Sequence, residues 1–378
     1  MLPKGWKNAH LASLCEKISD GIHTTPNYDE HSDVFFVNGN NIQPNGLNFF
    51  ENTKRVSQKD YEKYKKDIGS NTILMSINGT IGNTCLYNNE RVVLGKSACY
   101  LDVKDNTDLI FILHSLRSSH LQNYFLSELT GTTIRNLSLK TIKTSNILLP
   151  PLPEQKKIAA ILSTWDRAIE GTEKLLANSQ QQKKALMQQL LTGKKRLPGF
   201  SGEWKKKTLS NVCQIKTGKK DVNEGCENGE YPFFTCAKQH TFSENYSYDC
   251  EAILIAGNGE VGKTHYYNGK FEAYQRTYIL SDFANISVFF LLHFIEFFLP
   301  LDISKEKQHG AMPYIKLGTL KDFSILNPPL PEQKAIAAVL TTADEELAAL
   351  ESDLTRLHQE KKALMQQLLT GKRRVTVD

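Results

Sequence analysis

A segment that occurs twice constrains the fold of this chain more than any other feature. The first copy runs from Leu152 to Lys194, beginning LPEQKKIAAIL and ending KKALMQQLLTGK. The second runs from Leu330 to Lys372, beginning LPEQKAIAAVL and ending with the same twelve letters. The offset is 178 residues throughout, so no residue has been gained or lost inside either copy. Because a helix that served only a local core would tolerate an extra turn, the constant length indicates that the two segments are matched to each other.

Each copy carries an apolar stripe with a period of seven residues. Steps of four and three from Ile158 meet apolar residues at seven of ten positions, and the same steps from Ile336 do so at nine of ten. A sustained seven-residue period is typical of a coiled-coil seam. The only polar residue that both seams share is a lysine, Lys183 in the first and Lys361 in the second. A polar seam residue usually sets register or partner at a cost in stability.

The residues at the ends of each copy predict one long helix. Pro153 and Pro331 lie where a helix begins, and Gly193 and Gly371, each followed by basic residues, mark where it stops. Roughly 39 residues at about 1.5 Å rise give a rod on the order of 58 Å long. The alternative is that each helix packs only on its own domain.

The composition is that of a soluble, multidomain, cytoplasmic protein. The chain has 378 residues, 40 % of them hydrophobic, and a formal net charge of +5, which allows a polyanionic partner without requiring one. The seven cysteines have no zinc-ligand spacing and are expected to be reduced thiols. No signal peptide is apparent, and the most apolar run, 286–301, is too short for a membrane span and is expected to be a buried helix.

The remaining sequence forms two blocks that are distant copies of each other. Trp6-Lys7 matches Trp204-Lys205 near the block starts, and Asn78-Gly79 matches Asn258-Gly259 in the middle. A tandem duplication gives four parts: a block at 1–151, a helix at 152–196, a block at 197–329 and a helix at 330–374. Strand-like runs such as 33–37 and 71–77, with helical periodicity at 109–129, indicate mixed α and β structure in the blocks. Constant helices are expected to be scaffold, and divergent blocks are expected to select a ligand.

A glycine-rich sequence in the second block, GNGEVGKT from Gly257 to Thr264, satisfies two nucleotide-binding patterns. Both patterns need a helix directly after the loop, because its N-terminal N–H groups hold the phosphates. The residues that follow, HYYNGKF, instead have a β-hairpin signature around Asn268-Gly269. The matching loop of the first block reads INGTIGNT and lacks the lysine. A tight turn between strands is therefore the preferred interpretation.

The sequence indicates neither a catalytic nor a metal site. Asn327-Pro328-Pro329-Leu330 is close to an amino-methyltransferase tetrapeptide, but the aromatic residue is missing and no glycine-rich S-adenosylmethionine loop precedes it. The prolines are explained as a rigid lead-in to the helix. Paired carboxylates with metal-like spacing, a nucleophile elbow and a zinc-protease motif are absent from the sequence. A chain of this kind is expected to bind rather than catalyse.

Two divergent blocks alternating with two near-identical helices resemble the specificity subunit of a type I restriction-modification enzyme. The resemblance covers essentially the whole chain. Its most specific parts are PLPEQKKIAAIL and PLPEQKAIAAVL, each with KKALMQQLLTGK, and GFSGEWKKKTL at the start of the second block.

This resemblance implies an α+β fold: two mixed α/β target recognition domains separated by two long antiparallel coiled-coil helices, with a pseudo-two-fold internal repeat. Each recognition domain would read one half of a bipartite site in double-stranded DNA. The helices would fix the gap between the half-sites and dock methyltransferase subunits, with two expected. Restriction and translocase subunits would join through the methyltransferases. The partner subunits would bind S-adenosylmethionine, ATP and Mg²⁺, so this chain would need no cofactor or metal of its own.

Candidate DNA contacts are polar and basic residues in turns, since Arg, Lys, Asn and Gln have the donor geometry to read base edges. In the first block they are Asn78, Thr80, Lys96, Arg135 and Asn136. In the second they are Lys219, Lys220, Asn258, Lys263, Gln275, Arg276 and Lys316. For each, the alternative is a solvated charge or a turn-forming Asn.

One apolar stripe cannot serve both the helix pair and a methyltransferase. Residues that flank the seams are therefore the candidate partner contacts, namely Leu175, Met187, Leu191, Met365 and Leu369. Three other functions stay open at this point: the specificity subunit of a type II-like fused system, a coiled-coil adaptor with two protein-binding heads, and a phosphate-loop ATPase.

Overall fold

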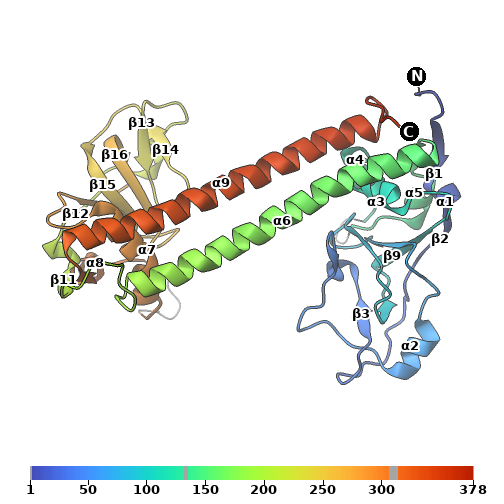
Figure 1. Ribbon diagram of the computed structural model, residues 1–378, viewed down its shortest axis with the longest axis horizontal. Coiled ribbons are helices and arrows are strands. Elements are labelled where there is room, and N and C mark those ends of the chain that lie inside the picture. The colour runs from blue at the N-terminus through green and yellow to red at the C-terminus, as the bar shows by residue number, and fades with distance from the viewer. Residues whose placement is uncertain (1, 132–134, 306–313, 378) are drawn as a thin grey trace. The chain divides into compact units, whose positions relative to one another are not determined.

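The computed structural model (Figure 1) describes residues 2–131, 135–305 and 314–377. The chain divides into two compact units. Unit 1 contains the residues up to Glu173 together with those from Asp353 onward, and unit 2 contains Lys174–Ser352. Each of the two long helices therefore begins in one unit and ends in the other.

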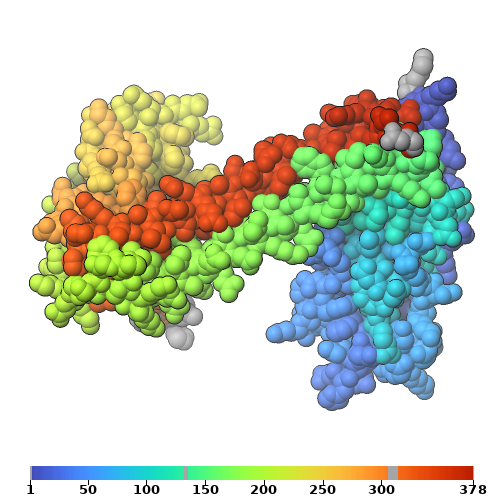
Figure 2. All heavy atoms as spheres, in the orientation of Figure 1, coloured from blue at the N-terminus to red at the C-terminus, as the bar shows by residue number. Residues whose placement is uncertain are grey.

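The long helices have the predicted positions and equal lengths. Helix α6 spans Leu152–Leu190 and α9 spans Leu330–Leu368, 39 residues each. All twenty predicted seam positions are buried or half-buried, which confirms the coiled-coil stripe. Within each unit the α6 and α9 segments run antiparallel. In unit 1 the segments lie side by side in Figure 2, α6 in green and α9 in red, and the ion pair of Asp166 with Lys361 joins them.

The globular part of unit 1 is built on a four-stranded sheet of order β2-β9-β6-β7, with three smaller strand pairs around it. Helices α3 and α4 confirm the helical periodicity predicted at 109–129, with a break at Ser118, which caps α4. The elements before α6 are β1 Lys7–His10, α1 Leu11–Leu14, β2 Cys15–Asp20, β3 Phe35–Val37, η1 Gly39–Asn41, β4 Ile42–Gln43, β5 Gly46–Leu47, α2 Gln58–Tyr64, β6 Thr72–Ser76, β7 Thr84–Leu86, β8 Val92–Leu94, β9 Ala98–Val103, α3 Leu109–Arg117, α4 Ser119–Ser127, α5 Leu139–Thr144 and β10 Asn146–Leu149.

The globular part of unit 2 is built on a six-stranded sheet of order β12-β17-β15-β16-β13-β14. Helix α7 confirms the buried helix predicted from the most apolar run of the sequence. The elements between the long helices are β11 Lys205–Thr208, η2 Leu209–Asn211, β12 Gln214–Thr217, η3 Val222–Glu224, β13 Tyr231–Phe234, β14 Thr241–Ser243, β15 Tyr248–Ala256, β16 Thr264–Ala273, β17 Thr277–Ser281, α7 Val288–Lys305, α8 Leu317–Lys321 and β18 Ser324–Asn327.

The two units repeat the same pairings, which confirms the duplication. Strand β1 pairs antiparallel with β10 just before α6, and β11 pairs in the same way with β18 just before α9. The β6-β7 hairpin of unit 1 corresponds to the β15-β16 hairpin of unit 2. Each unit closes its main apolar core with residues from both long helices, for example Ile158 and Leu368 in unit 1 and Leu190 and Ile336 in unit 2. The alternative in which each helix serves one domain alone is therefore wrong.

A buried glutamate anchors the start of each long helix. In unit 1, Glu154 accepts a hydrogen bond from Trp6 Nε1 at 3.0 Å and from Arg374 Nη2 at 2.8 Å. Arg374 also donates to the carbonyl of Lys4, so the N-terminal segment and the C-terminal tail meet there. In unit 2 the residues that correspond to this triad, Trp204, Arg196 and Glu332, form the same contacts. The Glu of the repeated LPEQK motif thus joins each helix to the chain segments beside it.

One sequence prediction is wrong. Asn268-Gly269 forms no hairpin turn, because β16 continues through both residues and pairs with β15 from Thr264 to Phe271. Gly269 has a φ of +136°, and this glycine lets the strand pass through a backbone conformation that other residues rarely adopt. Within the described ranges, no helix combines the length and apolar character needed to cross a bilayer. All seven cysteines are free thiols.

Candidate nucleic-acid interface

The candidate DNA contacts of unit 2 lie on four loops that backbone hydrogen bonds bring together. Gly257 N donates to Arg276 O at 3.0 Å, Ile315 N donates to Gly257 O at 2.8 Å, and Gln275 N donates to Lys220 O at 2.9 Å. The segments 218–221, 257–263, 274–276 and 314–316 therefore form one surface, which we call loop cluster 2. All seven residues predicted for this block lie on it.

The polar side chains of loop cluster 2 differ in whether they already contact another charged or polar side chain. Lys220 is held by Glu224 at 2.6 Å, and this hydrogen bond raises the pKa of the lysine. Gln275 Nε2 lies 3.4 Å from Asp221 Oδ2. In contrast, Lys263 and Arg276 are exposed and form no ion pair with any described residue. The ammonium of Lys263 and the guanidinium of Arg276 are thus both accessible to an external ligand.

Unit 1 assembles the equivalent loops with the same hydrogen bonds. Ile77 N donates to Ser97 O at 3.0 Å and Leu137 N donates to Ile77 O at 2.9 Å, as Gly257 and Ile315 do in unit 2. Asn78 and Asn136 form a backbone bridge. The segments 77–83, 95–97 and 135–137 form loop cluster 1, which contains all five residues predicted for this block.

Loop cluster 1 presents both amide and cationic groups. Lys96 and Arg135 are exposed. Thr80 Oγ1 donates to Gly39 O at 3.2 Å, so this hydroxyl is engaged inside the protein. The side-chain oxygen of Asn78 is buried and accepts no hydrogen bond from the described residues. Buried polar atoms normally have a hydrogen-bond partner, so this acceptor is unsatisfied.

Sequence reasoning missed residues that the fold adds to these surfaces. The turn around η1 lies against loop cluster 1, because a Cβ on Gly39 would fall 2.7 Å from Asn78 O, and it exposes Asn40. In unit 2 the carbonyl of Cys236 accepts a hydrogen bond from Glu260 N, which places exposed Lys238 beside loop cluster 2. No sequence pattern indicated either residue, because both lie on segments remote in sequence from the hairpin turns.

The glycine-rich sequence is a strand-to-strand turn, as predicted. It joins β15 to β16, and the ten residues from Thr264 onward are strand rather than helix. The loop therefore lacks the helix N-terminus that holds phosphates in nucleotide-binding proteins.

The candidate partner contacts are mostly buried. Leu175 is 57 % exposed, but Met187 and Leu191 belong to the core of unit 2, and Met365 and Leu369 belong to the core of unit 1. Their helix faces turn toward the globular parts, which the seam pattern did not reveal. Of these five residues, only Leu175 is exposed in the isolated chain.

The duplicated α+β units and the paired helices define the class of fold, and sequence comparison identifies its family. The family model described as "Type I restriction modification DNA specificity domain" matches residues 3–178 and 201–357. The chain belongs to this family of type I restriction-modification specificity subunits, whose function is DNA sequence recognition.

Two curated relatives illustrate the similarity. The putative type I restriction enzyme MjaX specificity subunit of Methanocaldococcus jannaschii is 26 % identical over 99 % of this chain and 95 % of its own length. The type I restriction enzyme EcoDI specificity subunit of Escherichia coli is 36 % identical over 42 % of this chain, and the match spans about a third of that relative, 34 %.

Solved structures share the fold. The S subunit of a type I restriction-modification system from M. genitalium matches 100 % of both chains with a TM-score of 0.69 at 20 % identity. A structure described as showing complex assembly and conformational transition of the type I system matches with a TM-score of 0.59 at 19 % identity.

Proposed function

We propose that loop clusters 1 and 2 each read one half of a bipartite, gapped site in double-stranded DNA. The observation that carries this proposal is that the two clusters are built by equivalent hydrogen bonds and present exposed donors on equivalent turns. Two copies of one reading surface in one chain suit a site with two halves. Their different side chains, Lys96 in one and Gln275 with Arg276 in the other, suit two different half-sequences.

We further propose that α6 and α9 set the gap and dock the methyltransferase subunits, two per chain. The catalytic work then belongs to the partners: S-adenosylmethionine on the methyltransferases, and ATP with Mg²⁺ on the restriction and translocase subunits that join through them. The matched helix lengths support the spacing role, because a gapped site needs a spacer of constant length. One base pair more in the gap would also rotate one reader by about a tenth of a DNA turn.

Mapping N6-methyladenine across the genome of cells that express this chain with its methyltransferase tests the proposal. The expected result is a split motif with a constant gap. Methylation without such a motif, or a chain that binds only protein, would contradict the proposal.

Arginine and lysine substitutions separate base reading from phosphate binding. Arg276→Ala is expected to relax one position of one half-site, at a discrimination of about 1–3 kcal/mol, and Arg135→Ala to do the same in the other half. Lys263→Ala is expected to weaken binding to all sequences and lower the salt slope by about one. Exposed Lys334 on α9 serves as the control, and Lys334→Ala is expected to change neither motif nor slope.

A further inference from the structure

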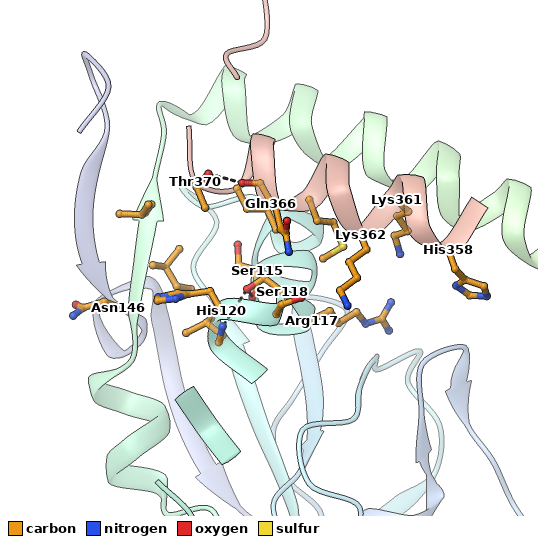
Figure 3. A pocket seen from close by; sticks show the side chains of 16 residues that line it. Ser115, Arg117, Ser118, His120, Asn146, His358, Lys361, Lys362, Gln366 and Thr370 are labelled. Carbon is orange, nitrogen blue, oxygen red and sulfur yellow. Dashed lines mark hydrogen bonds between the residues drawn. The ribbon is translucent and has the colours of Figure 1, made fainter. Parts of the chain in front are cut away.

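Unit 1 contains a cavity of about 390 Å³ between α3, α4, β10 and the C-terminal part of α9. Figure 3 shows Lys362 and Gln366 of α9 and Ser115 and Ser118 near the α3–α4 break around this space. The proposed DNA contacts do not line it.

The repeat shows why the cavity exists. Helix α3 corresponds to the start of α7, with Phe111 matching Phe290 and His114 matching His293. In this alignment three serines of unit 1 stand where unit 2 has phenylalanines. The matched pairs are Ser115 with Phe294, Ser118 with Phe297, and Ser119 with Phe298.

In unit 2 the three phenylalanines pack in the main apolar cluster of the unit. Phe294 and Phe298 lie 4.4 Å apart between ring centroids, and Phe297 and Phe298 lie 4.9 Å apart. These rings belong to the same apolar cluster as Leu186 and Met187 of α6. Leu364 and Met365 of α9 occupy the corresponding positions of the repeat. Unit 2 therefore holds aromatic side chains in its main apolar cluster at repeat positions where unit 1 has serines that line the cavity.

The cavity has an apolar floor. Leu121, Ile147, Met365 and Leu369 line it, and all four are buried. Apolar side chains that face an empty space lack van der Waals contacts on that side, and an aromatic ring in the cavity would supply them. An aromatic group is therefore the favoured occupant.

The walls of the cavity are cationic. Arg117 and Lys362 line it with His120 and His358, and the described residues that line it include no carboxylate. The Arg117 guanidinium donates to the carbonyls of Pro44 and Thr84, which are neutral groups, and the carboxylate of Asp166 also acts on its charge. Lys361, which also lines the cavity, is paired with Asp166. In unit 2, Glu296 matches Arg117. The two units therefore differ in the sign of the charge at this position, as well as in having serines or phenylalanines at the three positions above.

We propose that this cavity is a socket for one aromatic side chain, flanked by carboxylates, from a methyltransferase subunit. The inference rests on the docking role proposed above and gives it a location. The ring fills the space left by Ser115, Ser118 and Ser119. The flanking carboxylates lie against Arg117 and Lys362. The socket also explains how Met365 and Leu369 can serve a partner although little of their surface is exposed in the free chain.

Affinity of the purified full chain for the methyltransferase subunit of the same system tests the socket. Ser119→Phe places in unit 1 the ring that unit 2 carries, and Lys362→Glu reverses the charge of the wall. Each is expected to weaken binding of the methyltransferase subunit that contacts unit 1 at least tenfold, and to leave binding of a second subunit at unit 2 unchanged. Two controls change the same chemistry elsewhere: Ser127→Phe adds a ring to an exposed position of α4, and Lys59→Glu reverses an exposed charge on α2, outside the long helices and the cavity lining. Both controls are expected to bind within threefold of the unaltered chain.

The outcomes separate the socket from the docking role. Ser119→Phe and Lys362→Glu chains that bind like the controls would overturn the socket while leaving the docking role intact. An unaltered chain that binds no methyltransferase would overturn the docking role. If Ser119→Phe prevents folding, Lys362→Glu and a photo-crosslinker at Gln366 decide: the crosslink is expected on a segment with an aromatic residue beside Asp or Glu, and a segment without them contradicts the proposal.

Discussion

At the scale of single residues, the repeated LPEQK motif attaches each long helix to its globular part. Gln155 donates through Nε2 to Pro150 O at 2.9 Å and accepts at Oε1 from Asp108 N at 2.9 Å. Gln333 does the same with Pro328 O and Ser287 N, at 2.8 and 2.7 Å. Both glutamines are buried. A buried amide that satisfies two backbone groups explains why the motif retains Gln in both copies.

Replacing Gln333 by Leu is expected to lower the free energy of unfolding by about 2–4 kcal/mol. The reason is that Pro328 O and Ser287 N would each lose a partner, at about 1–3 kcal/mol per buried group left unsatisfied. Denaturant unfolding followed by circular dichroism measures the change. The neighbouring exposed Lys334 provides the control, since Lys334→Leu is expected to stay within about 0.5 kcal/mol. Equal stability of the two variants would show that the glutamine bridge contributes nothing.

A buried histidine predicts a pH dependence of stability. Burial lowers the pKa of His114 to about 4, although Asp166 on α6 opposes this shift. Lys361 on α9 and Arg117 on α3 add to the lowering. In the unfolded chain a histidine has a pKa of about 6.5. Acid therefore protonates the unfolded chain first, and the free energy of unfolding is expected to fall as pH drops from about 6.5 to about 4.

Replacing His114 by Leu is expected to remove this part of the pH dependence, on the order of 2–3 kcal/mol between those pH values. Unfolding measured at intervals from pH 7.5 to 4.5 compares the variant with the unaltered chain. The exposed His31 serves as control, and the His31→Gln curve is expected to follow that of the unaltered chain. Parallel curves for His114→Leu and the unaltered chain would contradict the assignment.

At the scale of elements, the sequence predicted what depends on local pattern. The length of each long helix followed from the exact repeat, and the buried stripe followed from its seven-residue period. The hairpin turn at 257–263 followed from the pattern Asn-Gly-x-(Ile/Val)-Gly-x-Thr that both blocks share. The Asn268-Gly269 turn failed because the pairing of β16 with β15 outweighed a local turn preference.

The sequence could not predict contacts that join distant segments. The seam lysines showed no partner in the sequence, yet Lys361 pairs with Asp166 and Lys183 pairs with Asp344. The burial of Met187 and Leu191 was also missed. A heptad pattern identifies the face turned to the other helix, but it gives no information on which further face a globular part covers.

The two seam ion pairs predict a specific rescue. Lys361→Asp places a carboxylate beside Asp166 and is expected to lower the free energy of unfolding by about 1–3 kcal/mol. Adding Asp166→Lys restores an opposite-charge contact, so the double variant is expected to recover most of the loss. Combining Lys361→Asp with Asp344→Lys is the matched control, because Asp344 pairs with Lys183 instead. Thermal unfolding of the four chains checks the prediction. Equal recovery of stability in both double variants would mean that the loss depends on the net charge of the chain and not on the pairing of Lys361 with Asp166.

At the scale of the whole molecule, the duplication gives two long helices that are nearly identical and two loop clusters whose side chains differ. The helices keep one length and one set of anchoring residues, Glu154 with Gln155 and Glu332 with Gln333. The loop clusters keep their backbone hydrogen bonds while their side chains differ. If the loop clusters read half-sites as proposed above, such a chain would acquire a new half-site by changing one loop cluster without altering the helices.

Inserting four residues into α6 after Ser179 is expected to change the gap of the recognised DNA site or to abolish recognition. The half-site sequences are expected to stay the same. Four residues lengthen a helix by about 6 Å, and they also interrupt the seven-residue period, so one reader would shift and rotate relative to the other. Mapping of methylated adenines in cells expressing the insertion variant with its methyltransferase measures the gap. Four residues inserted after exposed Gly199, outside the helix, form the control and are expected to leave the gap unchanged. If the helix variant methylates sites with the parental gap, α6 does not set the spacing.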